Sequence, residues 1–338
     1  MSHETIATPA LYRSKLTLLE TERAIKLLKD TFERELAERL NLMRVSAPLF
    51  VLPKTGLNDD LNGVERPVSF DIPSLDGAEG QIVHSLAKWK RQALHRYGIA
   101  PGAGLYTDMN AIRRDETLDR IHSLYVDQWD WEQVITERDR TREMLVAAAQ
   151  AVLDAMRATE LCLMEHFPVF GRKLPEKLFV ITTQELEDRY PALSPKERED
   201  AICREYAAVL LTEIGGVLKS GNPHDGRAPD YDDWGLNGDI LLWEYPCGHA
   251  LELSSMGIRV DAAAMHRQLA LAGCEQRSVL PFHQGVLEGI LPLTMGGGIG
   301  QSRLCMYLLE KAHIGEVQAS CWPTSMWETC EKVGIHLL

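Results

Sequence analysis

Residues 126–132 read VDQWDWE and alternate in polarity with a period of two. Because successive side chains of a strand point to opposite faces, this segment places Gln128, Asp130 and Glu132 on one face. Asp127 and two tryptophans share the other face. A strand with one polar face and one apolar face is typical of an antiparallel sheet. The polar row either faces bulk water or lines a binding site, and this stretch alone fits both interpretations.

The rest of the chain mixes helical and strand patterns without the strand–helix–strand rhythm of a parallel sheet. Apolar residues at helical spacing predict helices over 14–41, 83–97 and 141–165. Shorter apolar segments predict strands, which cover 124–135, 178–183, 238–244 and 251–260. In SPKERED, Ser194 and Glu197 form a capping box that opens a further helix. These patterns favour an α+β fold with a mainly antiparallel sheet flanked by helices.

Length and composition limit the classes of protein that fit. The chain has 338 residues and no Pro/Gly/Ser-rich linker, so we expect one domain over 1–338. Its net charge of −13 argues against a role in binding nucleic acid, which needs a basic surface. No apolar run is long enough for a membrane helix or a signal peptide, so we expect a cytoplasmic protein without a membrane partner.

The cysteines predict neither disulfides nor a metal centre. There are 7 of them, an odd number, and no CxxC pair occurs, so we interpret them as reduced thiols. Cys247 and His249 lie close together in CGHA, but two ligands do not make a zinc site.

The segment GGGIGQSRL, residues 296–304, is the sharpest local signal for a ligand. Glycines permit a tight turn and close approach of the backbone, and the start of a helix favours anions. Arg303 in the first turns of that helix could stack on a base or bind a phosphate. The surroundings match neither a Rossmann fingerprint nor a Walker loop. A glycine turn that only packs a helix against a sheet fits equally well.

Four further segments concentrate polar groups. Arg113 and Arg114 precede an acidic loop that returns as the strand at 126–132, which either holds a phosphate or is a solvated hairpin. Ser85 and Lys90 in HSLAKWKRQ lie where a strand meets a helix, and Lys90 alone would ordinarily be a surface residue.

The other two segments are RAPDYDDW and LELSSMGIRV. The first crowds acidic residues into a turn, where they are usually solvated. The second places Glu252, Ser255 and Arg259 in a segment otherwise suited to burial. Charges inside an apolar strand need partners or a ligand, so the second segment is the more informative of the two.

Together these segments resemble the catalytic core of class II aminoacyl-tRNA synthetases, in the aspartyl branch. AIRRDE resembles the second motif of that class, with Arg113 as its arginine, and VDQWDWE resembles the strand that follows it. GGGIGQSR resembles the third motif, with Arg303 as its arginine. LNLMRVSAPLF resembles the first motif, which forms the dimer interface, with Pro48 as its proline. No segment resembles an anticodon-binding domain.

The chain is identified as a member of a narrower family, the ammonia-dependent aspartate–ammonia ligases of the asparagine synthetase A type. Six segments match the family nearly verbatim and in order: HSLAKWKRQ, VDQWDWE, RAPDYDDW, GLNGDIL, ELSSMGIRVD and GGGIGQSRL. The resemblance implies ATP-dependent activation of the side-chain carboxylate of L-aspartate with Mg²⁺. The β-aspartyl-AMP so formed reacts with ammonia to give L-asparagine, after release of pyrophosphate and with release of AMP.

The resemblance also implies roles for individual residues. For the reaction itself these are Asp59, Arg113 and Arg303. For aspartate they are Ser85, Lys90, Gln128, Asp130, Asp232, Ser255 and Arg259. For ATP and AMP they are Arg113, His122, Glu252, Gly298, Gly300 and Arg303. For Mg²⁺ they are Asp239 and Glu252. Asp59 is expected to attract ammonium and accept its proton, Asp130 to meet the amino group of aspartate, and Glu132 to face metal or phosphate.

One departure and two rival interpretations remain open at this stage. The family carries a longer stretch where Trp234 directly precedes Gly235 here, which puts any assignment to an active-site lid in doubt. One rival is an enzyme of the same fold with another acceptor, such as tRNA. The other is an inactive paralogue that senses aspartate or adenylate. The joint presence of four residues argues against it: Lys90, Arg113, Asp130 and Arg303.

We predict a homodimer, because the extended segment around Pro48 follows a long helix as in the dimer motif of this class. Isologous two-fold dimers are the commonest oligomers. Light scattering at micromolar concentration should give the mass of two chains, and a stable monomer would contradict this prediction.

Overall fold

The structure, a computed structural model, describes residues 12–61 and 65–338. Its α-helices are α1 (Leu18–Leu40), α2 (Ala87–Tyr97), α3 (Arg142–His166), α4 (Thr183–Arg189), α5 (Pro195–Tyr206), α6 (Ala262–Leu271), α7 (Pro281–Leu287), α8 (Gln301–Leu308) and α9 (Thr324–Lys332). Its strands are β1 (Leu42–Arg44), β2 (Phe50–Val51), β3 (Ser69–Ile72), β4 (Ala78–Ile82), β5 (Gly104–Ile112), β6 (Tyr125–Val134), β7 (Phe179–Thr182), β8 (Ala208–Thr212), β9 (Asp232–Glu244), β10 (His249–Arg259) and β11 (Thr294–Gly300). No helix in these ranges is long and apolar enough to cross a bilayer.

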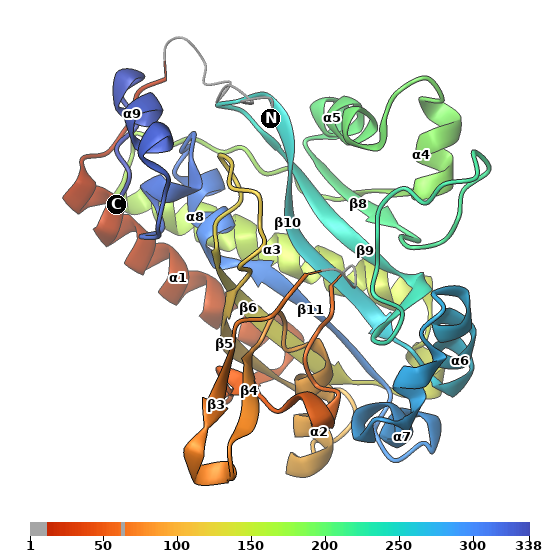
Figure 1. Cartoon of the computed structure of the whole chain (residues 1–338). Helices are drawn as coiled ribbons and strands as arrows, with labels where there is room; N and C mark the ends of the chain where they lie inside the picture. Colours follow the sequence, from red (N-terminus) through yellow and green to blue (C-terminus); the bar gives the residue numbers. More distant parts are fainter. Residues whose placement is uncertain (1–11, 62–64) are drawn as a thin grey trace.

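An eight-stranded sheet organises the molecule, with strand order β1-β5-β6-β11-β10-β9-β8-β7 (Figure 1). The pairs at its two edges, β1 with β5 and β7 with β8, are parallel, and the pairs between them are antiparallel. The prediction of an α+β fold with a mainly antiparallel sheet is therefore confirmed. A second, three-stranded sheet has the order β2-β4-β3.

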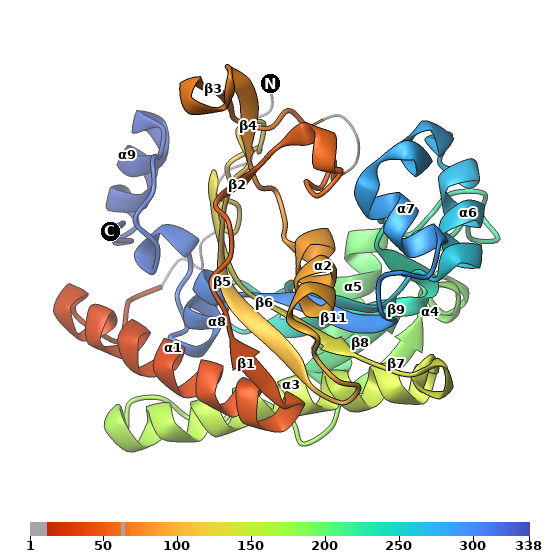
Figure 2. The ribbon, with the colours of Figure 1, turned by 90° about the horizontal axis from the view of Figure 1, so that it is seen from below.

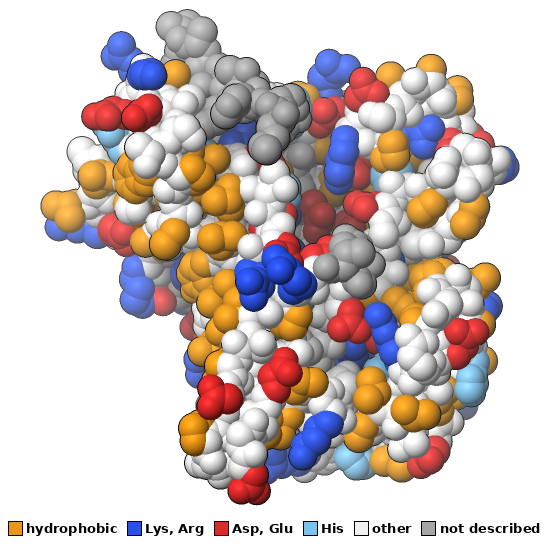
Figure 3. Space-filling view, viewed as in Figure 1, with side chains coloured by type: hydrophobic (Ala, Val, Ile, Leu, Met, Phe, Trp, Pro, Cys, Tyr) orange, Lys and Arg blue, Asp and Glu red, His pale blue; other side chains and the backbone are white. Residues whose placement is uncertain are grey.

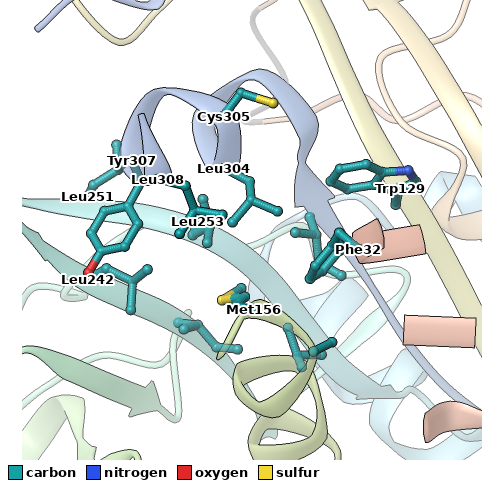
Figure 4. Close-up of a cluster of buried hydrophobic side chains, with 14 of the residues drawn as sticks. Phe32, Trp129, Met156, Leu242, Leu251, Leu253, Leu304, Cys305, Tyr307 and Leu308 are labelled. Atoms are coloured by element: carbon teal, nitrogen blue, oxygen red, sulfur yellow. The ribbon is translucent and has the colours of Figure 1, made fainter. Parts of the chain in front are cut away.

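The two faces of the large sheet are covered differently. Figure 2 shows α1 and α3 together beneath the sheet and α2 on the opposite side. Trp129 and Trp131 point to the side of α1 and α3, where both are buried, and the ring of Trp129 lies 4.7 Å from that of Phe32. Figure 4 shows the same layer farther along the sheet, where Leu304 and Leu308 of α8 pack against leucines of the central strands. This apolar layer covers one face of the central strands, so polar groups can occupy the opposite face.

The predicted helices form with the expected signals. Thr17 and Glu20 make a reciprocal capping box at the start of α1, so the helix begins four residues later than the pattern over 14–41 suggested. Ser194 and Glu197 form the same box at the start of α5, as predicted. The helix expected over 83–97 begins only at Ala87, because β4 extends to Ile82 and the four residues between them are irregular.

The glycine-rich segment 296–300 is a strand, so the prediction of a glycine turn is wrong. It lies within β11, in the middle of the sheet between β6 and β10. Its glycines are needed because neighbouring side chains occupy the space above them. A Cβ at Gly296 would lie 2.0 Å from Glu132 Oε2 and 2.5 Å from the carbonyl oxygen of Trp131. Glycine is therefore used here for room rather than for a turn.

The acidic segment at 230–233 is not the solvated turn that its composition favours. Asp230 is fully buried and accepts hydrogen bonds from Lys88 at 2.9 Å, His283 at 3.0 Å and Arg277 at 3.2 Å. Burial opposes ionisation of Asp230, but Lys88 and His283 hold its pKa far below the usual value. One carboxylate thus ties this segment to α2, α7 and the 3₁₀ turn Glu275–Val279.

Replacing Gly296 with alanine should destabilise the fold by about 1–3 kcal/mol, since the added methyl must displace either a backbone carbonyl or the buried Glu132 carboxylate. Urea unfolding should show this as a lower midpoint. Gly171→Ala is the matched control, because nothing lies within 4 Å of its added Cβ. Equal midpoints for the two variants would contradict the packing described here.

Replacing Asp230 with asparagine should cost about 3–5 kcal/mol, since it leaves the buried Lys88 ammonium without its counter-charge. Thermal or urea unfolding measures the loss. Asp188→Asn removes an exposed pair with Lys219 and should change stability by less than about 1 kcal/mol. A loss at Asp230 no larger than the loss at Asp188 would refute the structural role.

Candidate active site

A cavity of about 580 Å³ opens over the polar face of the central strands. Figure 3 shows the surface hollowed near the centre of the view, with acidic side chains at the bottom of the hollow. Apart from Glu132, every residue that the sequence analysis assigned to aspartate, nucleotide, metal or the reaction lines this one cavity. The structure therefore brings together groups that are as much as 244 positions apart, from Asp59 to Arg303.

The floor of the cavity is a row that crosses four strands. Asp130 of β6 pairs with Gly298 of β11, Gly298 with Ser255 of β10, and Ser255 with Asp239 of β9. Paired positions of antiparallel strands share a face, so these side chains point into the same space. A Cβ at Gly298 would lie 2.5 Å from Gln128 Oε1 and 2.8 Å from Asp130 Oδ1. The missing side chain is what leaves room for both groups.

A β-bulge brings Glu252 to the same face as Ser255. Strict alternation would place these two residues on opposite faces, but the register of β10 against β9 shifts between Glu252 and Ser254. Both side chains line the cavity, whereas Leu253 and Met256 point into the core. The bulge therefore adds a carboxylate to the polar face without breaking the apolar one.

Asp130 and Lys90 form one end of the site. Lys90 is almost fully buried, lies 3.3 Å from Asp130 Oδ2 and donates to the carbonyl oxygen of Gly297 at 3.0 Å. Burial lowers the pKa of Lys90, although Asp130 and Glu132 oppose the shift. The other oxygen of Asp130, Oδ1, is buried without a hydrogen-bond partner in the described part of the chain. Buried carboxylate oxygens are rarely left so, and this one needs an N–H or O–H donor.

Arg259 is held between two buried carboxylates. It donates to Glu132 Oε2 at 2.7 Å and also binds Asp232, while Thr294 donates to Glu132 Oε1 at 2.7 Å. Burial works against the charge of Glu132, but Arg259 keeps its pKa below the usual value. Glu132 does not line the cavity, so the expectation that it faces metal or phosphate is wrong. The Glu132 carboxylate is fully buried, bonded by Arg259 and Thr294 and 3.9 Å from the Lys90 ammonium.

Arg227 is a cavity residue that the sequence analysis did not assign. It donates to Asp239 Oδ1 at 2.8 Å and to Ser255, and its Nε lies 3.5 Å from Asp232 Oδ2. The available signal was an arginine three positions before a run of aspartates, which was interpreted as a solvated turn. Arg227 instead joins the segment before β9, which forms a wall of the cavity, to Asp239 and Ser255 on the floor.

The opposite end of the cavity is cationic. Arg303 donates to the carbonyl oxygen of Glu252 at 2.8 Å, and the Nε of Arg113 is buried without an acceptor in the described residues. Burial works against the charge of Glu252, but Arg303, Lys196, Arg227 and Arg113 together hold its pKa below the usual value. Several cations surround one carboxylate, and Arg113 still has an N–H without an acceptor. This end of the cavity is therefore suited to an anionic ligand.

Asp239 and Glu252 are the pair that fits a divalent cation. Burial, reinforced by Glu252 and opposed by Arg227, raises the pKa of Asp239 to about 7. A cation between the two carboxylates would relieve their repulsion, and oxygen ligands suit Mg²⁺. No group of three metal-ligating side chains occurs within residues 12–61 and 65–338. The remaining ligands would therefore have to come from a bound phosphate or water.

Two further predicted residues lie at the walls. Asp59 is 2% exposed and accepts hydrogen bonds from Ser85 Oγ at 2.9 Å and from the N–H of Leu61 at 2.9 Å. His122 lies in the loop between β5 and β6, and its Nδ1 is 2.7 Å from Asp119 Oδ2. Cys247 and His249 do not meet around a shared site, since His249 contacts Asp200 instead.

Solved structures share this fold. The asparaginyl-tRNA synthetase of Pyrococcus horikoshii, complexed with asparaginyl-adenylate, superposes with a TM-score of 0.65 at 15% identity over 90% of this chain and 70% of that one. The aspartyl-tRNA synthetase of Entamoeba histolytica gives a TM-score of 0.59 at 13% identity over 88% and 57% of the two chains. The expected class II aminoacyl-tRNA synthetase fold is therefore confirmed.

Closer relatives extend over the whole chain. An aspartate–ammonia ligase of Clostridium perfringens is 59% identical over 335 residues, which cover 99% of this chain and 100% of that protein. An aspartate–ammonia ligase of Bacillus cytotoxicus is 58% identical over 327 residues, 97% and 100% of the two chains. The profile of the aspartate–ammonia ligase family matches residues 19–334. The chain belongs to the aspartate–ammonia ligase family and is an enzyme.

Proposed function

We propose that this enzyme makes L-asparagine from L-aspartate, ammonia and ATP through a β-aspartyl-AMP intermediate, with release of AMP and pyrophosphate. The observation that carries the proposal is the polarity of the cavity. At one end, Asp130 has Lys90 beside its Oδ2 and leaves its Oδ1 without a partner, and at the other end Arg113 and Arg303 lie around Glu252. This arrangement suits an amino acid at one end and a nucleotide phosphate at the other.

Aspartate is held at the end formed by β6 and α2. Its amino group meets Asp130 Oδ1, which supplies the missing donor. Its α-carboxylate meets Lys90 and Arg259, and Gln128 and Ser255 bond the remaining oxygens. In this pose the side-chain carboxylate points along the floor toward the arginines. The class II tRNA synthetases activate the α-carboxylate, so the amino acid here lies turned around in a similar cavity.

ATP is held at the arginine end. Arg113 contacts the α-phosphate, and Arg303 lies against the adenine and reaches the outgoing phosphates. His122 lies at the rim, and the glycines Gly298 and Gly300 let the nucleotide approach the strand. Asp239 and Glu252 would hold Mg²⁺, which supplies neutralisation of the phosphate charge. Positioning and charge neutralisation are the main requirements of this type of transfer.

Nitrogen enters from the side of Asp59. This carboxylate attracts ammonium and accepts a proton, after which the neutral amine attacks the activated carbonyl. Ser85 orients the carboxylate through its 2.9 Å hydrogen bond.

We also propose that the chain acts as one cytoplasmic catalytic unit and as a homodimer. Met43, Leu49 and Phe50, in the segment that resembles the dimer motif, are 55%, 52% and 42% exposed in the single chain. Three apolar side chains in one exposed segment suit an interface between two copies.

A product assay tests the main proposal. Purified enzyme is incubated with aspartate, ATP, Mg²⁺ and ammonium, and asparagine, AMP and pyrophosphate are quantified. Equal amounts of the three are expected. Formation of ADP, or a requirement for glutamine or tRNA, would overturn the proposal.

Arg303→Ala should leave the fold intact and slow adenylate formation tenfold to a hundredfold or more. Loss of a hydrogen bond from a charged group costs about 1.5–3 kcal/mol. Aspartate-dependent exchange of pyrophosphate into ATP measures this step. Arg157→Ala, which removes a surface arginine bonded to Asp154, is the matched control. Near-normal exchange by the Arg303 variant would contradict the assignment.

The two half-reactions should separate at Asp130 and Asp59. Asp130→Asn keeps the size but loses the charge that meets the substrate ammonium, so exchange and asparagine formation should fall together. Asp59→Asn should retain exchange, need much more ammonium to form asparagine, and lose more adenylate to hydrolysis. If Asp59→Asn abolishes exchange as fully as Asp130→Asn does, Asp59 belongs to the aspartate pocket.

A further inference from the structure

The helix α8, which carries Arg303, begins without a capping side chain of its own. Its N-cap residue is Gly300, which has no side chain to accept from the N–H groups of the first turn. A side chain at this position would press on Arg303, because a Cβ at Gly300 would lie 3.1 Å from the Cβ of Arg303 and 3.4 Å from its Cγ and Cδ. The stem of Arg303 thus lies over bare backbone, and the cap has to come from another segment.

Asp127 of β6 supplies this cap. Its Oδ1 accepts from the N–H of Ser302 at 3.1 Å, and its Oδ2 accepts from the Ser302 hydroxyl at 2.8 Å. Ser302 is the second residue of α8, and its N–H is one of the groups that an N-cap side chain normally binds. Asp127 lies beside the start of the helix because the next residue of β6, Gln128, pairs with Gly300. A negative charge at this end of a helix is favourable, so the carboxylate fixes the first turn of α8 to the sheet.

Asp127 is itself held in place by two more side chains. It is buried, and its carboxylate also accepts from Gln318 Nε2 at 3.2 Å and from Lys29 Nζ at 3.1 Å. Gln318 donates to the Ser302 hydroxyl as well, at 3.0 Å. Lys29 comes from α1, so the network joins that helix, β6 and α8. The carboxylate therefore has a counter-charge and cannot shift without breaking several hydrogen bonds.

Arg303 follows Ser302 directly, so the turn that Asp127 caps also sets where the arginine starts. From there the guanidinium reaches the cavity and donates to the carbonyl oxygen of Glu252 at 2.8 Å. A site for phosphate chemistry requires its charged groups within a fraction of an ångström of the productive position, and supporting hydrogen bonds supply that precision. The network behind Ser302 is suited to this role.

We propose that Asp127 is a positioning residue for Arg303, which it holds toward the nucleotide phosphates by capping α8. The inference rests on the proposed function, in which Arg303 binds ATP. Asp127 acts through the helix in this role and touches neither aspartate nor ATP. It also reaches the cavity, so a direct contact with the nucleotide is the alternative that the experiment must separate.

Asp127→Asn tests this role, because it keeps the size of the side chain and removes the charge at the start of α8. In pyrophosphate exchange, kcat/KM for ATP should fall about fivefold to thirtyfold, as expected for the loss of a helix cap. The aspartate KM should stay within about twofold of wild type, since that end of the cavity shares no partner with the cap. Glu160→Gln is the matched control. It changes another buried carboxylate that accepts from backbone N–H groups, those of Lys173 and Leu174, and it should alter neither value.

The same substitution in an Arg303→Ala background decides between the two routes. If Asp127 acts through Arg303, Asp127→Asn should change exchange there by less than about twofold. A full further loss would show that Asp127 contacts the nucleotide or acts through another group, and would overturn the proposal. Unchanged exchange by the single variant would overturn it as well.

Two further measurements keep the test decisive. If Asp127→Asn does not fold, Ser302→Ala replaces it in the cycle, with an expected loss of about twofold to tenfold for one hydrogen bond. A wild-type enzyme without exchange would refute the proposed function rather than the role of Asp127. The cycle is then run on the dissociation constant of ATP, measured by calorimetry, where additive losses would still overturn that role.

Discussion

The buried guanidinium of Arg259 is the interaction on which the site depends. It joins Glu132 of β6 to Asp232 at the start of β9, and it stands on β10 between them. An isolated charge at this depth would not be tolerated, so the three groups are stable only together. Their joint placement sets the spacing of the strands that carry Asp130, Ser255 and Asp239, and so keeps the floor of the cavity in register.

A large part of this arrangement is predictable from the sequence, for identifiable reasons. The alternation around Trp129 and Trp131 fixes which face of β6 is apolar, because the period of a strand is two. The capping boxes at Thr17 and Ser194 mark helix starts. The residues named from the resemblance meet in one cavity, with the exception of Glu132, although no local pattern could show that they meet.

Other features escape local reasoning because they depend on neighbours distant in the chain. The glycines of β11 look like a turn, since nothing in their own segment reveals that Glu132 and Asp130 from another strand fill the space above them. Asp230 looks solvated until Lys88 and His283 are brought to it by two helices. Glu252 and Ser255 violate the two-residue period, and the register shift that reconciles them is visible only in the paired strands.

The bare backbone beneath Gln128 and Asp130 also limits how such a pocket can change. The pocket is deep at Gly298 because this residue has no side chain, so no substitution there can make the pocket deeper. Single mutations on β11 can only make the cavity smaller or displace the side chains that cross it. A wider amino-acid preference would therefore have to arise on the walls, where Ser85, Arg227 and Tyr231 offer side chains to shorten. Changes in substrate preference are thus expected in the walls of the pocket and not on β11.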